Sequence, residues 1–350
     1  ATAGTVKVGG DIKGSDANGA LGKIILSGPT NVYIGGELTT AVNAAGTKDI
    51  DINGDVLLTA NTILDATAGD GTIDFDGKID SSSATNHTLT LKAGTGTITI
   101  DGVIGSTNDI GAFKINDDLT GSGAITLSGV GDVSTPKIGI TGAVDIGHTS
   151  TASVTLNGTA YNIDGDTTIT TTTAADKIII GGAMTIKTAG DKVEFVGGGI
   201  TLNDGKDLTI TAGAGNVTLT DIGATSSEVI DIEGATVTAA VIGNADEIKS
   251  VKLDGSTKVV LGGNITTSNT TGNNVDIDGA TELAAATVTI NTSANDGTIN
   301  FNSSINSDSG NARNLVLKAK GGNITVTGKI GVTDGLGTLA INDDYASGTG

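Results

Sequence analysis

The sequence predicts an all-β fold, a parallel β-helix (a solenoid) of about 25 residues per coil, and three observations lead to this prediction. Gly makes up 55 of the 350 residues, whereas there are only two Pro and no Trp. The apolar residues are mostly Val, Ile and Leu, which favour strands, and Gly punctuates them. A short strand motif and a long internal repeat complete the pattern. Gly enrichment without Pro excludes collagen, and the apolar content is too high for a simple disordered tail.

The short motif reads apolar, any residue, apolar, any residue, Gly, any residue, apolar. It occurs at 6–12 and returns at Val32, Ile73 and Ile98, among other positions. A period of two places the first two apolar side chains on one face of a strand, and Gly then permits a sharp turn. Strands this short are stable only when stacked. At about 4.8 Å per coil, we expect about 14 coils in a rod of roughly 65–70 Å.

The long repeat sets the expected organisation of the chain. Residues 70–118 align without a gap with residues 296–344, at an offset of 226, and 24 of the 49 positions are identical. We therefore interpret 1–226 as a first long repeat unit and 227–350 as the first half of a second unit. One continuous solenoid is expected, as a segment of a longer chain, in which the two copies superpose coil for coil.

Alternation along the strands predicts which side chains are buried. Ile98 and Ile100 are expected to point inward and Thr99 outward, so that a charge at either Ile would disrupt the core and a charge at Thr99 would be mild. The four Phe are also expected inside the coils; they are Phe75, Phe113, Phe195 and Phe301.

Charge and cysteine content exclude several classes of protein. The chain has 39 acidic and 19 basic residues, a net charge of −20, and Arg313 is its only arginine. Nucleic acid and anionic membrane surfaces both attract basic faces, so neither is an expected partner. The absence of Cys removes disulfides, thiol catalysis and cysteine zinc sites. No apolar run approaches the length of a membrane-spanning segment, which is roughly 18 residues or more.

The run at 89–105, Leu-x-Leu-x-Ala-Gly-x-Gly-x-Ile-x-Ile-x-Gly-x-Ile-Gly, resembles the large β-strand-repeat surface proteins of bacteria. These are similar to filamentous-haemagglutinin-type adhesins and autotransporter passengers. The resemblance covers nearly the whole chain. It implies secretion, a right-handed solenoid and a role as a fibre, adhesin or coat, and it carries over no functional residue.

The sequence assigns no catalytic, cofactor-binding or metal-binding residue. His87 and His148 lie in Thr/Ser-rich stretches without a nucleophile-elbow motif, and Arg313 replaces His87 in the second repeat copy. The acidic pairs Asp117-Asp118 and Asp343-Asp344 recur with the repeat, whereas a catalytic pair is normally unique. We therefore expect a protein that is not an enzyme, with structural or capping acids.

Calcium is the one cofactor that stays open. Acidic clusters occur at 116–118, 164–166 and 203–207, and calcium is bound by six to eight oxygens. None of these clusters has EF-hand spacing, and the glycine-rich nonapeptide array is missing. The competing interpretation is turn formation by Asn and Asp side chains at coil corners.

Three functions are compatible with these observations. The first is a structural extracellular fibre or surface-coat protein that associates end to end or continues in the same chain. The second is an adhesin stalk that binds a cell-surface glycan or protein. The third is a polysaccharide depolymerase, which would need a groove with converging carboxylates. The regular repeat favours the first, located at the cell surface.

Overall fold

The computed structural model describes residues 4–13, 21–40, 49–117, 123–132, 139–172, 177–243, 248–267 and 271–342. They form an all-β parallel β-solenoid of about 12 turns with ~24 residues per turn, and this confirms the predicted fold class. The turn length agrees with the expected 25 residues, and the turns number about 12 where the sequence analysis expected 14. The helices of the described residues are two short 3-10 turns, and no α-helix is present among these residues. None of these helices is long and apolar enough to cross a membrane.

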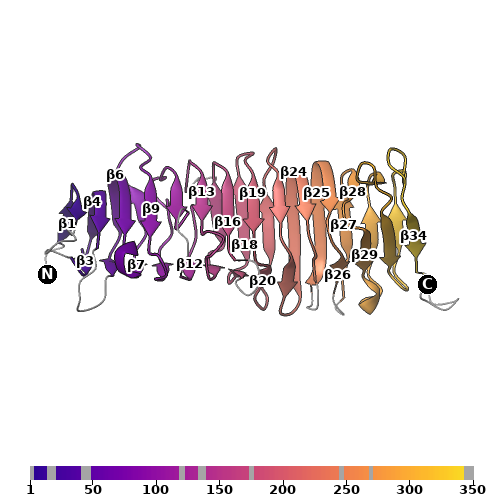
Figure 1. Ribbon diagram of the computed structural model, residues 1–350, viewed down its shortest axis with the longest axis horizontal. Helices are drawn as coiled ribbons and strands as arrows, with labels where there is room; N and C mark the ends of the chain where they lie inside the picture. The colour runs from indigo at the N-terminus through magenta and orange to yellow at the C-terminus, as the bar shows by residue number, and fades with distance from the viewer. Residues whose placement is uncertain are drawn as a thin grey trace. The chain divides into compact units, whose positions relative to one another are not determined.

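The chain divides into two compact units, which are described separately. The N-terminal unit comprises 1–181, 185–188 and 196–198. The C-terminal unit comprises 182–184, 189–195 and 199–350. In both units the strands are short and lie side by side along successive turns (Figure 1).

Each turn of the N-terminal unit has three faces, and two of them are joined by the long strands β4 (Asn31–Thr39) and β6 (Val56–Asp65). The first half of β6 pairs with β8 and its second half with β9, so the strand turns a corner of the coil. The third face is a separate sheet (Figure 1). The other strands of the joined faces are β1 (Thr5–Val8), β2 (Ile12–Lys13), β8 (Ile79–Ser81), β9 (Leu89–Lys92), β11 (Phe113–Ile115), β13 (Val144–Ile146), β15 (Ala160–Ile163) and β16 (Thr167–Thr170).

The separate sheet of this unit shows how the core is built. Its strands stack in parallel and in register, so that Ile50 lies over Ile73 and Ile73 over Ile98. These side chains are fully buried and form a continuous apolar column. The strands are β3 (Ile24–Ser27), β5 (Ile50–Asn53), β7 (Ile73–Phe75), β10 (Ile98–Ile100), β12 (Ile125–Leu127), β14 (Val154–Leu156) and β17 (Ile178–Ile180).

The C-terminal unit repeats this design with the long strands β24 (Glu228–Ala239) and β25 (Ile248–Leu261). The first half of β25 pairs with β27 and its second half with β28. The remaining strands of these two faces are β21 (Leu208–Thr211), β22 (Val217–Leu219), β27 (Val275–Asp278), β28 (Thr281–Leu283), β30 (Ile299–Phe301), β31 (Ile305–Ser307) and β33 (Ile324–Val326). The third face contains β20 (Ile200–Leu202), β23 (Ile222–Ala224), β26 (Ile265–Thr266), β29 (Thr287–Asn291), β32 (Asn314–Lys318) and β34 (Thr338–Ile341). Residues of β18 (Met184–Thr188) and β19 (Val193–Val196) are divided between the units.

The two repeat copies have the same local structure at equivalent positions. Strands β7, β8 and β10 correspond to β30, β31 and β33 with identical relative bounds. The 3-10 turns η1 (Thr67–Gly69) and η2 (Ser293–Asn295) also correspond. Each is followed by an aspartate in the left-handed region, Asp70 at φ 55° and Asp296 at φ 52°.

Equivalent strands nevertheless occupy different faces relative to the long strands of their own unit. Strand β7 belongs to the separate sheet, whereas its equivalent β30 follows the first half of β25 through β27. Strand β9 pairs with the second half of β6, whereas its equivalent β32 belongs to the separate sheet. At ~24 residues per turn, the repeat offset corresponds to about nine and a third turns. The two copies thus match strand for strand, but each strand of the second copy lies one face further round the coil. The expected coil-for-coil superposition did not include this shift.

The expected burial pattern is confirmed where it can be compared. Ile98 and Ile100 are fully buried, and Thr99 is half-buried between them on the outer face. All four Phe are buried in the core, none more than 2% exposed. Asp118, Asp343 and Asp344 lie outside the described residues.

Candidate functional site

Two basic residues that were considered as catalytic residues, His87 and Arg313, lie in equivalent loops that lead into β9 and β32. Their backbone N–H groups donate to Ser81 Oγ (3.1 Å) and Ser307 Oγ (2.9 Å) respectively. Arg313 also binds Asp308 in a bidentate ion pair, Nε to Oδ1 at 2.5 Å and Nη2 to Oδ2 at 2.7 Å. The guanidinium holds the pKa of the Asp308 carboxyl below its ordinary value. Arg313 is therefore engaged in holding its own loop.

His148 lies in a different loop of the N-terminal unit. Its ring Nδ1 is 3.2 Å from Thr149 Oγ1, and its backbone N–H donates to Thr151 Oγ1 at 2.7 Å. In the described part of the chain, neither His148 nor His87 has a ring hydrogen bond to a carboxylate or a serine. A nucleophilic triad needs both contacts, so the structure brings no such arrangement together around these residues.

Asp80 is a buried carboxylate that the sequence did not single out. It is 1% exposed, and its Oδ1 accepts hydrogen bonds from the N–H groups of Thr107 (2.7 Å) and Asn108 (3.1 Å). Lys78 Nζ lies 3.7 Å from its other oxygen. In the C-terminal unit, Asn306 takes its place and accepts from Thr333 N–H at 3.0 Å. The position fixes the loop of the next turn, and an amide serves as well as a carboxylate.

Two shallow polar hollows lie on the surface beside these loops. The hollow of the N-terminal unit is lined by Ser83, Ala84, Asn86, Thr107, Asn108 and Asp109. The hollow of the C-terminal unit is lined by Lys258, Ala280, Thr281, Glu282, Asn306, Ser307, Thr333 and Asp334. Thr107 and Asn108 are the repeat equivalents of Thr333 and Asp334, and the other residues that line the two hollows do not correspond. The Thr that both repeat copies have here, Thr107 and Thr333, was the one signal in the sequence that could have pointed to the hollows.

The acidic cluster at 203–207 is built around Glu228, a fully buried residue at the start of β24. Its Oε1 accepts from Gly205 N–H (2.9 Å) and from the Ser226 hydroxyl (2.8 Å), and its Oε2 accepts from Ser226 N–H (3.0 Å). Asp207 Oδ1 accepts from Val229 N–H at 2.8 Å. These carboxylates are thus engaged by protein donors, as expected for turn formation.

Asn116 has the same structural role at a coil corner. It is fully buried in the left-handed region, at φ 48°, and its Oδ1 accepts from Ala93 N–H at 2.8 Å. Its repeat equivalent Asn342, also at φ 48°, accepts from Ala319 N–H at 2.8 Å. The neighbouring Asp117 pairs with Lys114 at 2.6 Å. Asp164 and Asp166 lie at a corner with partial or full exposure. Within the described ranges, no three His, Cys, Asp or Glu residues are grouped to hold a metal ion.

Outward-facing aspartates stack along two faces. Burial, and then the negative charges of Asp76, Asp101 and Asp51, raise the pKa of the Asp74 carboxyl. Burial and Asp278 likewise raise the pKa of Asp276, although Asn302 donates to its Oδ1 at 3.0 Å. The second repeat copy has Asn300 and Asn302 where the first has Asp74 and Asp76. The stacked negative charges therefore lower the stability of the folded state, and the fold forms in spite of them.

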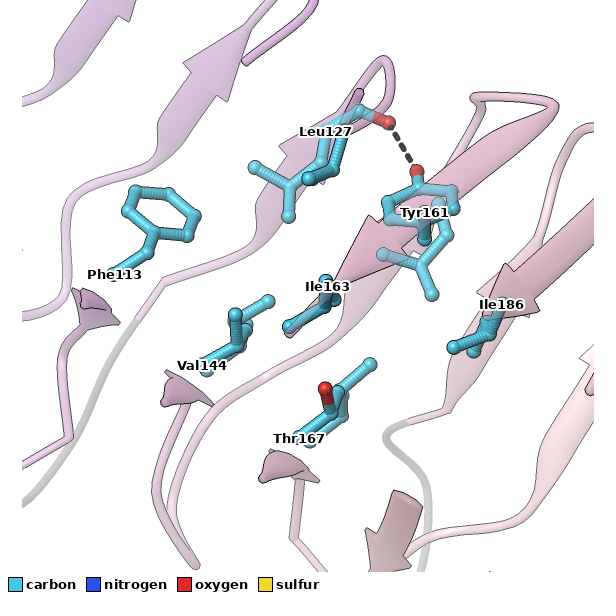
Figure 2. A pocket seen from close by; sticks show the side chains of 11 residues that line it. Phe113, Leu127, Val144, Tyr161, Ile163, Thr167 and Ile186 are labelled. Atoms are coloured by element: carbon cyan, nitrogen blue, oxygen red, sulfur yellow. Dashed lines mark hydrogen bonds between the residues drawn. The ribbon is translucent and has the colours of Figure 1, made fainter. Parts of the chain in front are cut away.

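The core of the N-terminal unit contains a small apolar cavity beside Tyr161. Figure 2 shows Phe113, Val144 and Ile163 around it, with the Tyr161 hydroxyl directed at the Leu127 carbonyl. That hydroxyl donates to Leu127 O at 3.0 Å and accepts from Gly158 N–H at 3.2 Å, and burial raises its pKa above the ordinary value. The cavity measures about 10 Å³, the space of one water-sized probe. It is a packing defect rather than a ligand site.

The fold defines the chain as a β-solenoid protein whose buried polar groups hold successive turns together. No protein-family model, no curated protein and no solved structure matches the chain.

Proposed function

We propose that the chain is a structural extracellular protein, a β-helical rod that forms part of a fibre or surface coat. The observation that carries this proposal is the use made of its polar side chains. Asp80, Asn116 and Glu228 are buried, and their oxygens accept backbone N–H groups of neighbouring turns and loops. Such residues stabilise stacking, and they are the groups from which an enzyme would build a site.

The charge and the resemblance to bacterial surface proteins support the same function. A net charge of −20 favours solubility and disfavours close lateral packing at low salt. Filamentous-haemagglutinin-type adhesins and autotransporter passengers combine secretion with a repetitive β-helical rod. On this basis the protein is located at the cell surface, is not an enzyme, and has copies of itself as its first partner.

Localisation on the producing cells tests this function. Intact cells are labelled with antibodies against the chain and examined by immunogold electron microscopy, with permeabilised cells as the control. The proposal predicts surface label on intact cells and loss of the protein after brief external protease treatment. Label confined to permeabilised cells would overturn it.

An adhesin stalk is the second candidate, and the two polar hollows favour it. Hydroxyl, amide and carboxylate groups line both, and such groups bind sugar hydroxyls. A glycan array probed with the chain tests this candidate. Specific binding that is lost in Asn86→Ala, but kept in the outward mid-unit variant Thr126→Ala, would support it. A chain that binds no glycan on the array would contradict this candidate.

A further inference from the structure

The polar hollow of the N-terminal unit is lined by segments of two successive turns, 83–86 and 107–109. Its volume is about 280 Å³. Pockets for drug-sized ligands begin at roughly 300 Å³, so the hollow has the size for a single sugar ring. What it can bind depends on which polar atoms the protein itself already uses.

Hydrogen bonds fix the two asparagines that line the hollow. The Asn86 amide donates from Nδ2 to Thr141 Oγ1 at 2.8 Å, and the Thr141 hydroxyl donates to Ile110 O at 3.1 Å. The Asn108 amide donates from Nδ2 to Ser81 O at 3.0 Å. Each amide nitrogen therefore already donates to the protein, whereas among the described residues no donor engages either amide oxygen. Both asparagines thus offer a fixed acceptor to a ligand.

The hydroxyl groups at the hollow are also held in place. Thr107 Oγ1 accepts from Lys78 Nζ at 3.1 Å, and the Thr107 N–H donates to the buried Asp80. Ser83 Oγ accepts from Thr85 N–H at 3.3 Å. The hollow therefore combines oriented hydroxyls with oriented amide oxygens, and side chains fixed in advance lose little conformational freedom when a ligand binds.

The charge at the hollow is negative. Among the described residues that line it, Asp109 is the one with a carboxylate, and the neighbouring Asp80 is balanced by Lys78 at 3.7 Å. The described ranges contain no grouping of acids that could hold a metal ion. One carboxylate together with two amide oxygens instead suits an ammonium group, which has three hydrogens to donate and no acceptor.

We propose that this hollow binds a hexosamine with a free amine, as one unit of a cell-surface glycan. The proposal rests on the proposed adhesin-stalk function and names its ligand. The ammonium group donates to the Asp109 carboxylate and to the amide oxygens of Asn86 and Asn108, and the ring hydroxyls contact Ser83 and Thr107. An N-acetylated hexosamine lacks the positive charge and carries extra bulk at the same position, so the hollow selects the free amine.

Isothermal titration calorimetry with a short sugar tests the ligand class. The probe is the disaccharide of two glucosamine units, and the matched control is the same disaccharide with both amines acetylated. The salt is about 0.15 M, where the screening length is about 8 Å, so that the net charge of −20 contributes little. We expect the free amine to bind at least about tenfold more tightly than the acetylated sugar, since acetylation removes a charge-assisted hydrogen bond.

Substitutions locate the binding in the hollow. Asp109→Asn removes the charge and keeps the shape, and should weaken binding of the glucosamine disaccharide about tenfold. Asn86→Ala removes one acceptor and should also weaken it. Glu233→Gln removes one exposed carboxylate elsewhere, and as the control it should bind like the wild type. Circular dichroism confirms that each variant is folded.

Several outcomes would overturn the proposal. They are no binding of the glucosamine disaccharide, equal affinity for the two disaccharides, and binding that Asp109→Asn and Asn86→Ala both leave unchanged. A loss in Glu233→Gln as large as that in Asp109→Asn would show attraction to the net charge alone. Equal affinity for lysine amide would show that the amine alone is recognised, and would overturn the assignment to a sugar.

The ligand and the proposed functions fail separately. A chain that binds other glycans through Asn86, but not the glucosamine disaccharide, would overturn the ligand and leave the adhesin stalk. A chain that binds no glycan but lies on the surface of intact cells would overturn the site and leave the structural rod. Binding of the disaccharide by a chain found only inside cells would overturn the surface function and leave the site in place.

Discussion

At the scale of single residues, the direction of a side chain decides what it can tolerate. Ile125 and Leu127 of β12 are fully buried, and Thr126 between them faces outward. Thr126 is stacked between Thr99 and Thr155. Thr99 is a poorer control than the sequence suggested because it is paired with Asp74, which adds like-charge repulsion to any acid placed there.

We therefore predict that Ile125→Asp lowers the free energy of unfolding by several kcal/mol, since an unpaired charge enters the core. Thr126→Asp should change it by less than about 1 kcal/mol. Urea denaturation followed by circular dichroism measures both. Equal losses for the two variants would contradict the inward and outward assignment.

Gly105 and Gly331 are repeat equivalents that test the covering of one turn by the next. Both lie in the left-handed region, at φ 68° and 67°. A Cβ added at Gly105 would lie 1.9 Å from the Gly139 carbonyl oxygen, whereas at Gly331 the nearest atom would be 3.3 Å away. Either Ala substitution costs about 1 kcal/mol for the backbone conformation, and Gly105→Ala should cost about 1–3 kcal/mol more for the clash. Identical urea midpoints in dilute solution would refute this difference.

The pH dependence of stability tests the stacked aspartates. The pKa of Asp74 is raised in the folded state, so its ionised form destabilises the fold at neutral pH. The penalty disappears as the pH falls through the raised folded value towards the ordinary value of 3.8. Asp74→Asn, which copies the natural Asn300, should modestly raise the melting temperature at pH 7 and leave it unchanged near pH 3.5. The exposed Glu233→Gln is the control, and a benefit of Asp74→Asn that persists at low pH would show that charge is not its cause.

At the scale of strands and loops, buried acceptors fix the segments between strands. Glu228 holds the loop before β21 by accepting from Gly205 and Ser226. Glu228→Gln places amide hydrogens against those donors, and should cost about 1–3 kcal/mol and increase exchange of the Gly205 amide. Glu233→Gln on the same strand is the control, because Glu233 is exposed. Urea midpoints and amide hydrogen exchange measure both effects.

The same exchange experiment addresses calcium at the 203–207 loop. The hydrogen bond from the Gly205 amide to Glu228 predicts that this loop amide is protected from exchange in the presence of a chelator. Protection that is present only after calcium is added would instead show that a metal ion organises the loop.

Sequence alone predicted strand type, burial alternation and the core position of each Phe, because these depend on local period and side-chain size. It did not predict which face a strand occupies. All three faces need the same apolar alternation, so Ile73 and Ile299 carry no mark of their different faces. Asp80 and Glu228 were also missed, because backbone partners such as Asn108 and Gly205 are a whole turn away in the chain and only the register of stacked turns brings them together.

At the scale of the whole chain, the repeat and the turn have different periods. At ~24 residues per turn, the long repeat is not a whole number of turns, so it returns each strand one face further on. The fold accepts this shift because stacking needs only the apolar alternation that all three faces share, and it does not depend on which strand of the repeat lies on which face.

Disulfide formation within the chain tests this account most directly, because the chain contains no natural cysteine. Thr126 and Thr155 are partners on the neighbouring strands β12 and β14, and paired residues on parallel strands lie at about 4.8 Å, within the reach of a disulfide. In the control, Lys114 on strand β11 of another face takes the place of Thr155. Under mild oxidation, the account predicts an internal disulfide in Thr126→Cys/Thr155→Cys and none in Thr126→Cys/Lys114→Cys, as measured by mass spectrometry of the digested protein. Equal yields in the two variants, or no disulfide in either, would contradict it.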